Sequence, residues 1–286
     1  MWWPRRSRAG RTRHPPGHFY SPIPDLDVVR ADDARIFADA TDVPGLHLDL
    51  AAQLDRVESI APAAAAIPFG EQPDGVHRYH LANTYFDQGD GVVLYGLLMT
   101  ERPRRVIEVG SGFSSALFLD ALDGTDTELT FVEPYPERLN ALLRDEDRDR
   151  AEVIERRAQD LSPQFFVDRL GSGDILFIDS SHVAKVGSDV NLLLLDVIPR
   201  LAPGVRVHIH DIFFPFEYPR RWVYEGRAWN ELYVVRALLV NNPGLQIEIF
   251  NCFLKKRARS VVADLLPFWN TNPGSSLWLR TVGSPQ

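Results

Sequence analysis

The chain has 286 residues, 45% of them hydrophobic and 24% charged, with one cysteine and a net charge of -8. A chain of this length holds one large domain or two small ones. The single cysteine, Cys252, excludes a disulfide scaffold and a zinc site built from several cysteines, and it favours a reducing, cytoplasmic setting. The acidic balance argues against a nucleic-acid partner, and no apolar run reaches the roughly 18 residues of a membrane span.

The first 18 residues are basic. They contain five arginines and no acidic residue, so the rest of the chain carries a net charge of about -13. Arg5-Arg6 would suit an export signal, but the apolar segment that such a signal needs is absent, and His14-Pro15-Pro16-Gly17 follows. We therefore expect residues 1–18 to be a disordered basic tail, or the product of a start site placed too early.

Residues 19–88 are expected to form a mainly helical cap over the domain that follows. Apolar residues stand at helical spacing from Asp49 to Val57, and an alanine run covers residues 63–66. A more apolar helix is predicted over residues 91–100, and Pro103 marks its end. We expect the main domain to comprise residues 89–286.

Beyond Pro103, short apolar segments alternate with amphipathic helices. This alternation is typical of βαβ units, in which helices cover both faces of a parallel sheet. The predicted strands are residues 105–109, 129–132, 152–155, 175–178 and 205–209, and the predicted helices are residues 114–122, 136–144, 163–170, 188–200 and 228–241. Two further strands, 245–250 and 277–280, have no clear helical pattern between them. We therefore expect them to pair antiparallel at the edge of a seven-stranded sheet.

Glycine and serine follow the first predicted strand, in the segment Gly110-Ser111-Gly112-Phe113-Ser114-Ser115. A doubly wound sheet binds its ligand at this edge, where glycines let backbone N–H groups approach the ligand and a serine can cap the next helix. A tight strand-to-helix turn would also explain the glycines. Glu133, however, ends the second predicted strand at the spacing at which a carboxylate binds the hydroxyls of a ribose. A nucleoside ligand is therefore favoured.

Two residues argue against a dinucleotide. Ser115 stands where a dinucleotide-binding loop has its third glycine, and Glu108 places at the loop a carboxylate that would repel a diphosphate and attract an ammonium group. S-adenosylmethionine carries an amino group, a sulfonium and a ribose, but no phosphate. An NAD-dependent oxidoreductase is the weaker alternative, and a non-catalytic sensor or scaffold that binds S-adenosylmethionine is a third.

Residues from about 90 to 286 resemble the class I S-adenosylmethionine-dependent methyltransferases. The segment 108–115 is similar to their first motif, and Val132-Glu133-Pro134 is similar to their second. The resemblance implies a Rossmann-like, doubly wound α/β sheet of seven mostly parallel strands with the last strand antiparallel. It further implies that the first motif faces the methionine part of the cofactor, Glu133 the ribose, and Gln159-Asp160 the adenine. Asp160 is equally suited to cap the helix that starts near Ser162.

The expected cofactor-binding residues are Glu108, Gly110, Ser111, Gly112, Ser114, Glu133, Gln159, Asp160 and Asp179.

Ionisable residues end the fourth and fifth predicted strands. Asp179 ends the fourth and His182 follows three residues later, while His210-Asp211 ends the fifth. Neighbouring parallel strands bring these ends to one edge of the sheet. Transfer of a methyl group to a hydroxyl needs a group that accepts the proton, and a histidine with a pKa of about 6.5 is suited to this. His182 is the expected base, and Asp179 and Asp211 are the expected ligands of a divalent metal or clamps for the substrate.

The segment Asp179-Ser180-Ser181-His182 resembles that of metal-dependent sugar O-methyltransferases, in which the acid binds Mg²⁺ and the histidine is the base. Those enzymes have a second acidic pair at the end of the next strand, where His210-Asp211 stands here, and catechol-type enzymes have Asp-Asn, whereas Ile212 follows here. Asp179, His210 and Asp211 are thus the predicted metal ligands, although a histidine would weaken a Mg²⁺ site or favour Mn²⁺, Fe²⁺ or Zn²⁺.

A different metal chemistry is possible for two histidines of the fifth strand. His208 and His210 lie on one face of it and with a carboxylate could hold iron, as in an oxygenase. That interpretation would leave the nucleoside loop unexplained. The simpler interpretation makes His208 a core histidine bonded to backbone.

An aromatic segment, residues 213–222, follows the fifth predicted strand. Its position after that strand favours the wall of an acceptor pocket over core packing. Tyr218, Trp222, Trp229 and Glu231 are the expected substrate contacts, and such rings suit a sugar or a phenol. The sequence therefore predicts a cytoplasmic O-methyltransferase for a small-molecule hydroxyl, with no nucleic-acid or membrane partner and with a homo-oligomer left open.

Overall fold

The computed structural model describes residues 13–283. They form two compact units, one made of residues 13–39 and 217–228 and the other of residues 40–216 and 229–283. Most of the predicted basic tail, residues 1–12, lies outside the described residues. Residues 13–18 form turns and bends, in which the ring of His14 stacks on that of His18 at 4.4 Å. The boundary expected between residues 88 and 89 falls inside the larger unit, and its functional meaning stays a prediction.

The smaller unit consists of three short helices. They are α1 (Leu26–Ala31), α2 (Asp33–Ile36) and α9 (Arg220–Tyr224). The carboxylate of Asp25 accepts hydrogen bonds from the first amides of α1, which explains why that helix begins there. Asp33 joins the two chain segments, because it pairs with Arg220 at 2.8 Å and accepts a hydrogen bond from the Tyr224 hydroxyl at 2.5 Å.

The larger unit contains the sheet and its covering helices. In chain order they are α3 (Leu50–Ala64), α4 (Gln88–Glu101), β1 (Arg105–Val109), α5 (Phe113–Ala121), β2 (Glu128–Val132), α6 (Glu137–Leu142), η1 (Asp145–Asp149), β3 (Ala151–Ile154), η2 (Ala158–Asp160), α7 (Pro163–Val167), β4 (Ile175–Ile178), α8 (Asp189–Asn191), η3 (Leu192–Val197), η4 (Ile198–Arg200), β5 (Arg206–Ile209), α10 (Glu231–Leu239), β6 (Leu245–Phe250), α11 (Asn251–Arg257), α12 (Arg259–Leu265) and β7 (Leu277–Thr281).

The seven strands form one sheet in the order β3-β2-β1-β4-β5-β7-β6. Strands β1 to β5 are parallel, and β7 runs antiparallel to both β5 and β6. The predicted α/β fold class is therefore confirmed, with each strand within a residue or two of its expected place. Because β1 lies between β2 and β4, the chain changes direction across the sheet there, which is where doubly wound sheets hold their ligands. We call the carboxyl ends of β1, β2, β4 and β5, with the residues that directly follow them, the rim.

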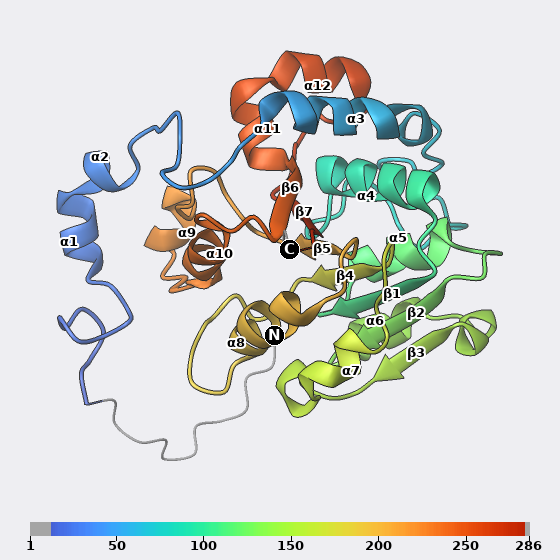
Figure 1. The fold of residues 1–286 in the computed structure, drawn as a ribbon, viewed down its shortest axis with the longest axis horizontal. Helices are drawn as coiled ribbons and strands as arrows, with labels where there is room; N and C mark the ends of the chain where they lie inside the picture. The colour runs from blue at the N-terminus through green and yellow to red at the C-terminus, as the bar shows by residue number, and fades with distance from the viewer. Residues whose placement is uncertain (1–12, 284–286) are drawn as a thin grey trace. The chain divides into compact units, whose positions relative to one another are not determined.

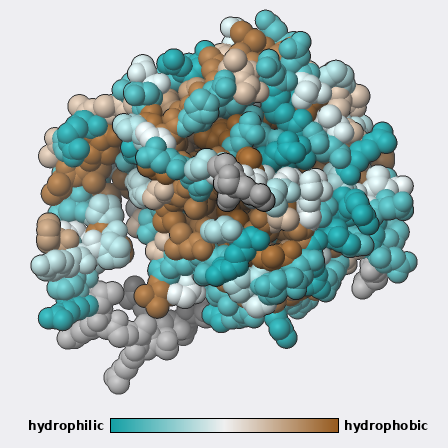
Figure 2. Space-filling view, in the orientation of Figure 1, coloured by the Kyte–Doolittle hydropathy of each residue, from teal (hydrophilic) through white to brown (hydrophobic). Residues whose placement is uncertain are grey.

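Burial explains why these segments became strands and helices. Strands β4 and β5 are buried along their whole length, as expected for central strands covered on both faces. Helix α4 is buried nearly all round because α3 packs closely against it at Gly96, where a Cβ would already lie 3.2 Å from Ala64. Figure 1 shows α3, drawn in blue, lying between α4 and α12. On the side of the sheet around β3, which is only partly buried, the surface is mostly hydrophilic (Figure 2).

The expectation of no helix between the last two strands is wrong. Helices α11 and α12 fill that connection and bury Phe253, Leu254 and Val262. Each has seven residues, which is two turns, and so short a segment shows little periodicity in the sequence. The antiparallel pairing of β6 with β7 is confirmed. Within residues 13–283, every helix is too short or too polar to span a bilayer.

Candidate active site

The loop between β1 and α5 passes close to the end of β4. Gly110 has a φ of 81°, in the left-handed region that glycine adopts without strain. A Cβ atom at this position would lie 1.8 Å from the carbonyl oxygen of Asp179, so only glycine allows this approach. The amide of Gly110 also donates to the carbonyl oxygen of Val132 at 3.0 Å. The loop is thus fixed against both neighbouring strands.

Replacing Gly110 by alanine is expected to lower the free energy of unfolding and to weaken the binding of a nucleoside ligand at the loop. The left-handed backbone alone costs alanine about 1–2 kcal/mol, and the clash with Asp179 must also displace the loop or the end of β4. Gly124→Ala is the matched control, because Gly124 has a φ of 69° and no atom within 4 Å of its ideal Cβ. Urea unfolding compares them, and equal destabilisation would mean that the close approach at Gly110 carries no energetic weight.

Glu108, in β1, forms hydrogen bonds to the serines that follow this loop. Its fully buried carboxylate accepts hydrogen bonds from the hydroxyls of Ser114 and Ser115, each at 2.5 Å. The Ser115 hydroxyl also accepts a bond from the amide of Gly112, the residue before α5, so the serine does cap this helix, from inside its first turn. Burial raises the pKa of Glu108 to about 8, although the two hydroxyls oppose the shift. The expected contact of Glu108 and Ser114 with the cofactor stays a prediction.

Glu133 ties the end of β2 to the same loop. One carboxylate oxygen accepts the amide of Ser111 at 3.0 Å, and the other accepts the amide of Tyr135 at 2.8 Å. The first oxygen also accepts the hydroxyl of Ser111 at 3.4 Å, but the second keeps a further lone pair and can still accept a bond from the hydroxyl of a ligand. The structure thus brings Glu133 to the loop, as its proposed role at the ribose requires.

Asp160 does not cap the helix after β3. It pairs with Arg157 at 2.6 Å, while the hydroxyl of Ser162 accepts the amide of Phe165 and so supplies the cap. Pro163 follows, a residue favoured at the first position of a helix. The alternative interpretation of Asp160 as a cap is therefore wrong, and the binding of adenine by Gln159 and Asp160 stays a prediction.

His182 lies among three carboxylates at the rim. Its Nδ1 is 2.8 Å from Oε2 of Glu231, and its Nε2 is 3.3 Å from Oδ1 of Asp179 and 3.8 Å from Oδ2 of Asp211. The carbonyl oxygen of His182 accepts the amides of Asn230 and Glu231, both at 3.1 Å. The start of α10 therefore fixes the backbone as well as the ring of this histidine.

The surrounding acids set the charge of His182. Burial lowers its pKa, but hydrogen bonds to Asp179 and Glu231 outweigh this effect and raise the pKa to about 10. Burial raises the pKa of Asp179, but His210 and His182 outweigh that, and the pKa lies well below its usual range. The pKa of Glu231 is raised by burial. The imidazole of His182 therefore holds its proton more tightly than a free histidine does.

His210 lies at the same edge with both ring nitrogens facing carboxylates. Its Nε2 is 3.4 Å from Oδ2 of Asp90, and its Nδ1 is 3.6 Å from Asp179 and 3.7 Å from Asp211. Burial lowers the pKa of His210, but Asp211 and Asp179 outweigh it, and the pKa lies well above its usual value. Asp211 also accepts a hydrogen bond from the Ser275 hydroxyl at 2.8 Å.

The backbone is strained at the ends of both strands. His182 and Asp211 each have a φ of 58°, in the left-handed region that residues other than glycine seldom adopt. Such strain persists only where the surroundings impose it, and it gathers at functional sites. The structure therefore brings Asp179, His182, His210 and Asp211 together, as expected, and holds two of them in strained turns.

The predicted metal ligands Asp179, His210 and Asp211 lie together, but their donor atoms face one another. In the part of the chain that the structure describes, no three side chains of His, Cys, Asp or Glu are arranged to hold a metal ion. A histidine ligand must present an unprotonated nitrogen to the metal, whereas both nitrogens of His210 face carboxylates. In this arrangement the three residues do not form a metal site, and metal binding stays a prediction.

His208 belongs to the core. Its ring is fully buried and stacks on Phe177 at 3.8 Å, and its Nε2 lies 2.8 Å from the hydroxyl of Ser276. Burial lowers the pKa of His208 well below its usual value, so the ring is neutral. The interpretation as a core histidine is confirmed, although its partner is a hydroxyl rather than backbone. With Nε2 turned to Ser276, the geometry gives no support to an iron centre with His210.

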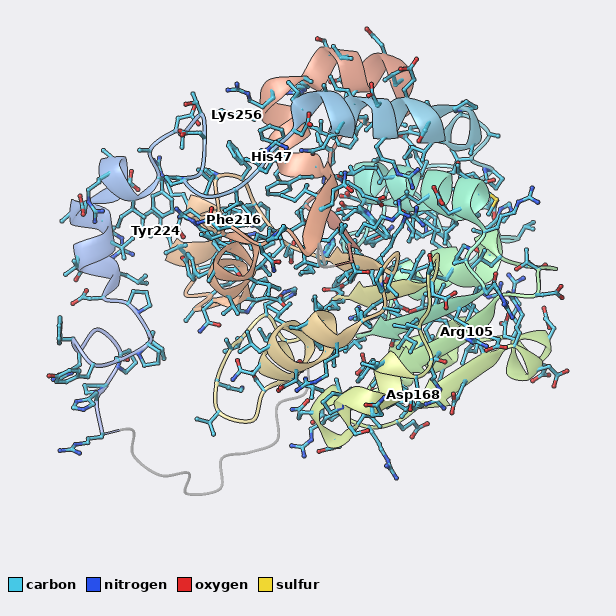
Figure 3. The ribbon with its side chains drawn as sticks, in the orientation of Figure 1. His47, Arg105, Asp168, Phe216, Tyr224 and Lys256 are labelled. Atoms are coloured by element: carbon cyan, nitrogen blue, oxygen red, sulfur yellow. The ribbon has the colours of Figure 1, made fainter. Side chains whose placement is uncertain are left out.

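The aromatic segment after β5 crosses from the larger unit, which ends at Phe216, into the smaller unit. Phe214 and Phe216, the latter labelled in Figure 3, pack against Phe250 with ring centroids 6.2 and 5.5 Å apart. Phe216 is buried and so belongs to the core, against the expectation of a pocket wall, whereas Phe214 is partly exposed and its role stays a prediction. Tyr218 and Trp222 belong to the smaller unit, and their substrate role stays a prediction.

Two of the predicted substrate contacts, Trp229 and Glu231, contact His182. The ring of Trp229 is 4.4 Å from the His182 ring, and Glu231 is fully buried with its carboxylate bonded to Nδ1. The role that this geometry indicates for Glu231 is to orient the histidine. Sequence reasoning also missed Asp90, because the predicted helix began at Gly91. The signal available in the sequence was an acidic residue directly before an otherwise apolar helix.

The chain is similar to several known proteins. A family model described as a methyltransferase domain matches residues 107–212. An uncharacterized protein of Archaeoglobus fulgidus is 33% identical over 162 residues, which cover 53% of this chain and 72% of that protein. The SAH-bound methyltransferase PaMTH1 of Podospora anserina has a TM-score of 0.43 and 15% identity, covering 90% of this chain and 96% of its own. An O-methyltransferase of Bacillus cereus in complex with SAH has a TM-score of 0.41 and 14% identity, covering 90% and 97%.

The strand order, the glycine loop and the acid at the end of β2 define a Rossmann-like methyltransferase. Residues 107–212 match this methyltransferase-domain family, which confirms the resemblance to the class I S-adenosylmethionine-dependent methyltransferases. The match supports an S-adenosylmethionine-dependent methyltransferase, as the sequence predicted. Neither an NAD-dependent oxidoreductase nor a non-catalytic sensor gains support.

Proposed function

We propose that the protein methylates a hydroxyl of a small-molecule acceptor, with His182 as general base and with Asp179 and Asp211 as clamps for the acceptor. The observation that carries this proposal is the position of His182. Its Nε2 faces the two acids at the ends of β4 and β5, at the edge where a sheet of this class holds its ligands.

Different residues of the rim orient the acceptor and accept its proton during methyl transfer. S-adenosylmethionine, when bound, supplies an electrophilic methyl group and leaves as a neutral thioether. The acceptor oxygen must lie about 3–3.5 Å from that methyl, in line with the sulfur. Asp179 and Asp211 orient the acceptor by accepting hydrogen bonds from its hydroxyls, and Nε2 of His182 takes the proton as the new C–O bond forms. Glu231 holds Nδ1–H and so leaves Nε2 as the reacting nitrogen.

We propose a sugar or phenolic hydroxyl as the acceptor group. Two carboxylates side by side suit an acceptor that donates hydrogen bonds, and the ring of Trp229 beside His182 can stack on a sugar or an aromatic ring. A cytoplasmic setting, inferred from the single cysteine, belongs to the same proposal.

Two measurements test the proposed function. Calorimetry is expected to show binding of S-adenosylmethionine and no binding of NAD. A panel of phenols, sugars, amines and carboxylic acids with a labelled methyl donor is then expected to give label on hydroxyl oxygen. Asp211→Asn is expected to raise KM for that acceptor, because one of its two clamps loses its charge. Label on amines alone would contradict the proposal of O-methylation.

A further inference from the structure

Asn230 directly precedes helix α10, but its side chain bonds a different segment of the chain. At this position an asparagine commonly accepts amides of its own first helical turn. Within residues 13–283, however, the Asn230 side chain accepts no amide of α10. Its Oδ1 accepts the amide of Ala184 at 2.6 Å, and its Nδ2 donates to the carbonyl oxygen of Ala184 at 3.1 Å. The side chain thus pairs with both polar groups of one residue, as the backbone of an antiparallel strand does.

The segment that Asn230 holds is fixed from its other end as well. Residues 181–184, which we call the His182 loop, lie between α8 and α10 (Figure 1). At the start of the loop, the carboxylate of Asp189 in α8 accepts the amide and the hydroxyl of Ser181 at 3.0 and 2.6 Å. At its end, the side chain of Asn230 holds the backbone. Two helices therefore fix the two ends of the His182 loop.

The strained residue of this loop lies against the start of α10. His182 has a φ of 58°, and a strained backbone persists only where the surroundings impose it. Its carbonyl oxygen accepts the amides of Asn230 and Glu231, both at 3.1 Å, and its Nδ1 lies 2.8 Å from Oε2 of Glu231. The two bonds from Asn230 to Ala184 hold the chain directly after His182. They therefore prevent the backbone of His182 from relaxing to a negative φ.

We propose that Asn230 is a positioning residue, which holds the His182 loop against α10 so that Nε2 of His182 faces the rim. The inference rests on the proposed function for the role of His182 as base. A base acts only when its reacting nitrogen lies within hydrogen-bond reach of the proton that it takes. A change in the φ of His182 would redirect its side chain and carry Nε2 away from the acids at the ends of β4 and β5.

Nuclear magnetic resonance tests this positioning without any acceptor. In protein labelled with ¹³C-histidine, the ring C–H signals of His182 are assigned by their loss in His182→Gln. The ring of Trp229, 4.4 Å away, is expected to displace these signals from those of a free histidine. In Asn230→Ala they are expected to move toward the free positions, because the released loop no longer holds the ring in one place. Unchanged His182 signals in Asn230→Ala would overturn the inference.

Kinetics test the consequence for methyl transfer. Asn230→Ala is expected to lower kcat by about 10- to 100-fold, since a displacement of about 1 Å costs a reacting group about that much. KM for S-adenosylmethionine is expected to stay unchanged, because Glu108 and Glu133 hold the glycine loop. Asn230→Asp keeps an oxygen for the amide of Ala184 but no donor for its carbonyl, and is expected to retain more of kcat than Asn230→Ala. Wild-type kcat in Asn230→Ala would overturn the inference.

The matched control is Asn242→Ala. Asn242 follows the other end of α10, is also partly buried, and also forms two bonds to backbone. Its Nδ2 donates to the carbonyl oxygen of Leu238 and its Oδ1 accepts the amide of Gly244, both at 2.9 Å. It lies before the start of β6, at the edge of the sheet opposite the rim.

Asn242→Ala is expected to lower stability in urea as Asn230→Ala does, but to keep wild-type kcat and the wild-type signals of His182. An equal loss of kcat in the two variants would make Asn230 a purely structural residue and overturn its positioning role. The resonance readout does not depend on the acceptor, so a failure to find any acceptor would count against the proposed function alone.

Discussion

Replacing His182 by glutamine is expected to lower kcat by about 10²–10⁴-fold, the usual contribution of a general base. Glutamine can still bond Glu231, but it cannot accept the proton of the acceptor. Affinity for S-adenosylmethionine is expected to stay unchanged, because the hydrogen bonds that hold the glycine loop come from Glu108 and Glu133. Steady-state kinetics with a hydroxyl acceptor and calorimetry with the cofactor measure the two quantities.

The matched control is His77→Gln. His77 also pairs with an acid, since its Nδ1 lies 2.6 Å from Asp74, but its ring packs against Phe69 and not at the rim. The control is expected to retain wild-type turnover. A His182→Gln protein with wild-type turnover would remove His182 as the base.

The second large effect is expected in Glu231→Gln and concerns the dependence on pH. In the wild type, the pKa of His182 is raised to about 10, so the unprotonated base is scarce at neutral pH. The ratio kcat/KM is therefore expected to rise with pH and to level off only above pH 10, because it follows ionisation of the free enzyme. Glu231→Gln removes one of the two acids that raise this pKa, so the rising limb moves to lower pH. The plateau falls by about 10- to 100-fold, because a charged hydrogen bond to Nδ1 is lost.

Asp147→Asn serves as the control for removing a buried carboxylate. Asp147 is fully buried and pairs with Arg78 and Arg150 at 2.5 and 2.9 Å, in the turn that leads into β3. Its loss is expected to lower stability without changing the pH range in which kcat/KM rises. If Glu231→Gln also leaves that pH range unchanged, Glu231 does not set the pKa of the base.

The parts of the fold that could be predicted are those with a strong local pattern. Strands such as Ile175–Ile178 are short apolar runs between polar turns, and the structure has them where the sequence placed them. Helices α11 and α12 were missed because each is two turns long and divided from the other at Ala258. Their burial depends on packing against α3, a contact that no local pattern reports.

In the site, too, residues near the ends of strands could be predicted, and residues that reach it from distant parts of the chain could not. Asp179, His182 and Asp211 lie within four residues of the ends of two neighbouring strands, so the geometry of a parallel sheet was enough to bring them together. Glu231 and Asp90 act on the rim from 49 and 120 residues away from the histidines they bond. Their side chains could be assigned only once the helices that carry them were placed.

The hydrogen bonds of Asp90 to His210, Asn251, Ser275 and Ser276 have a consequence for the order in which the chain assembles. They join residues 120, 161, 185 and 186 positions apart. Closing such long loops is entropically costly, and contacts of high sequence separation form slowly. During synthesis from the amino terminus, α4 is complete long before Ser275 and Ser276 exist to bond its first turn. The catalytic edge is therefore expected to be the last part of the sheet to mature, after the strands that carry its chemistry have already paired.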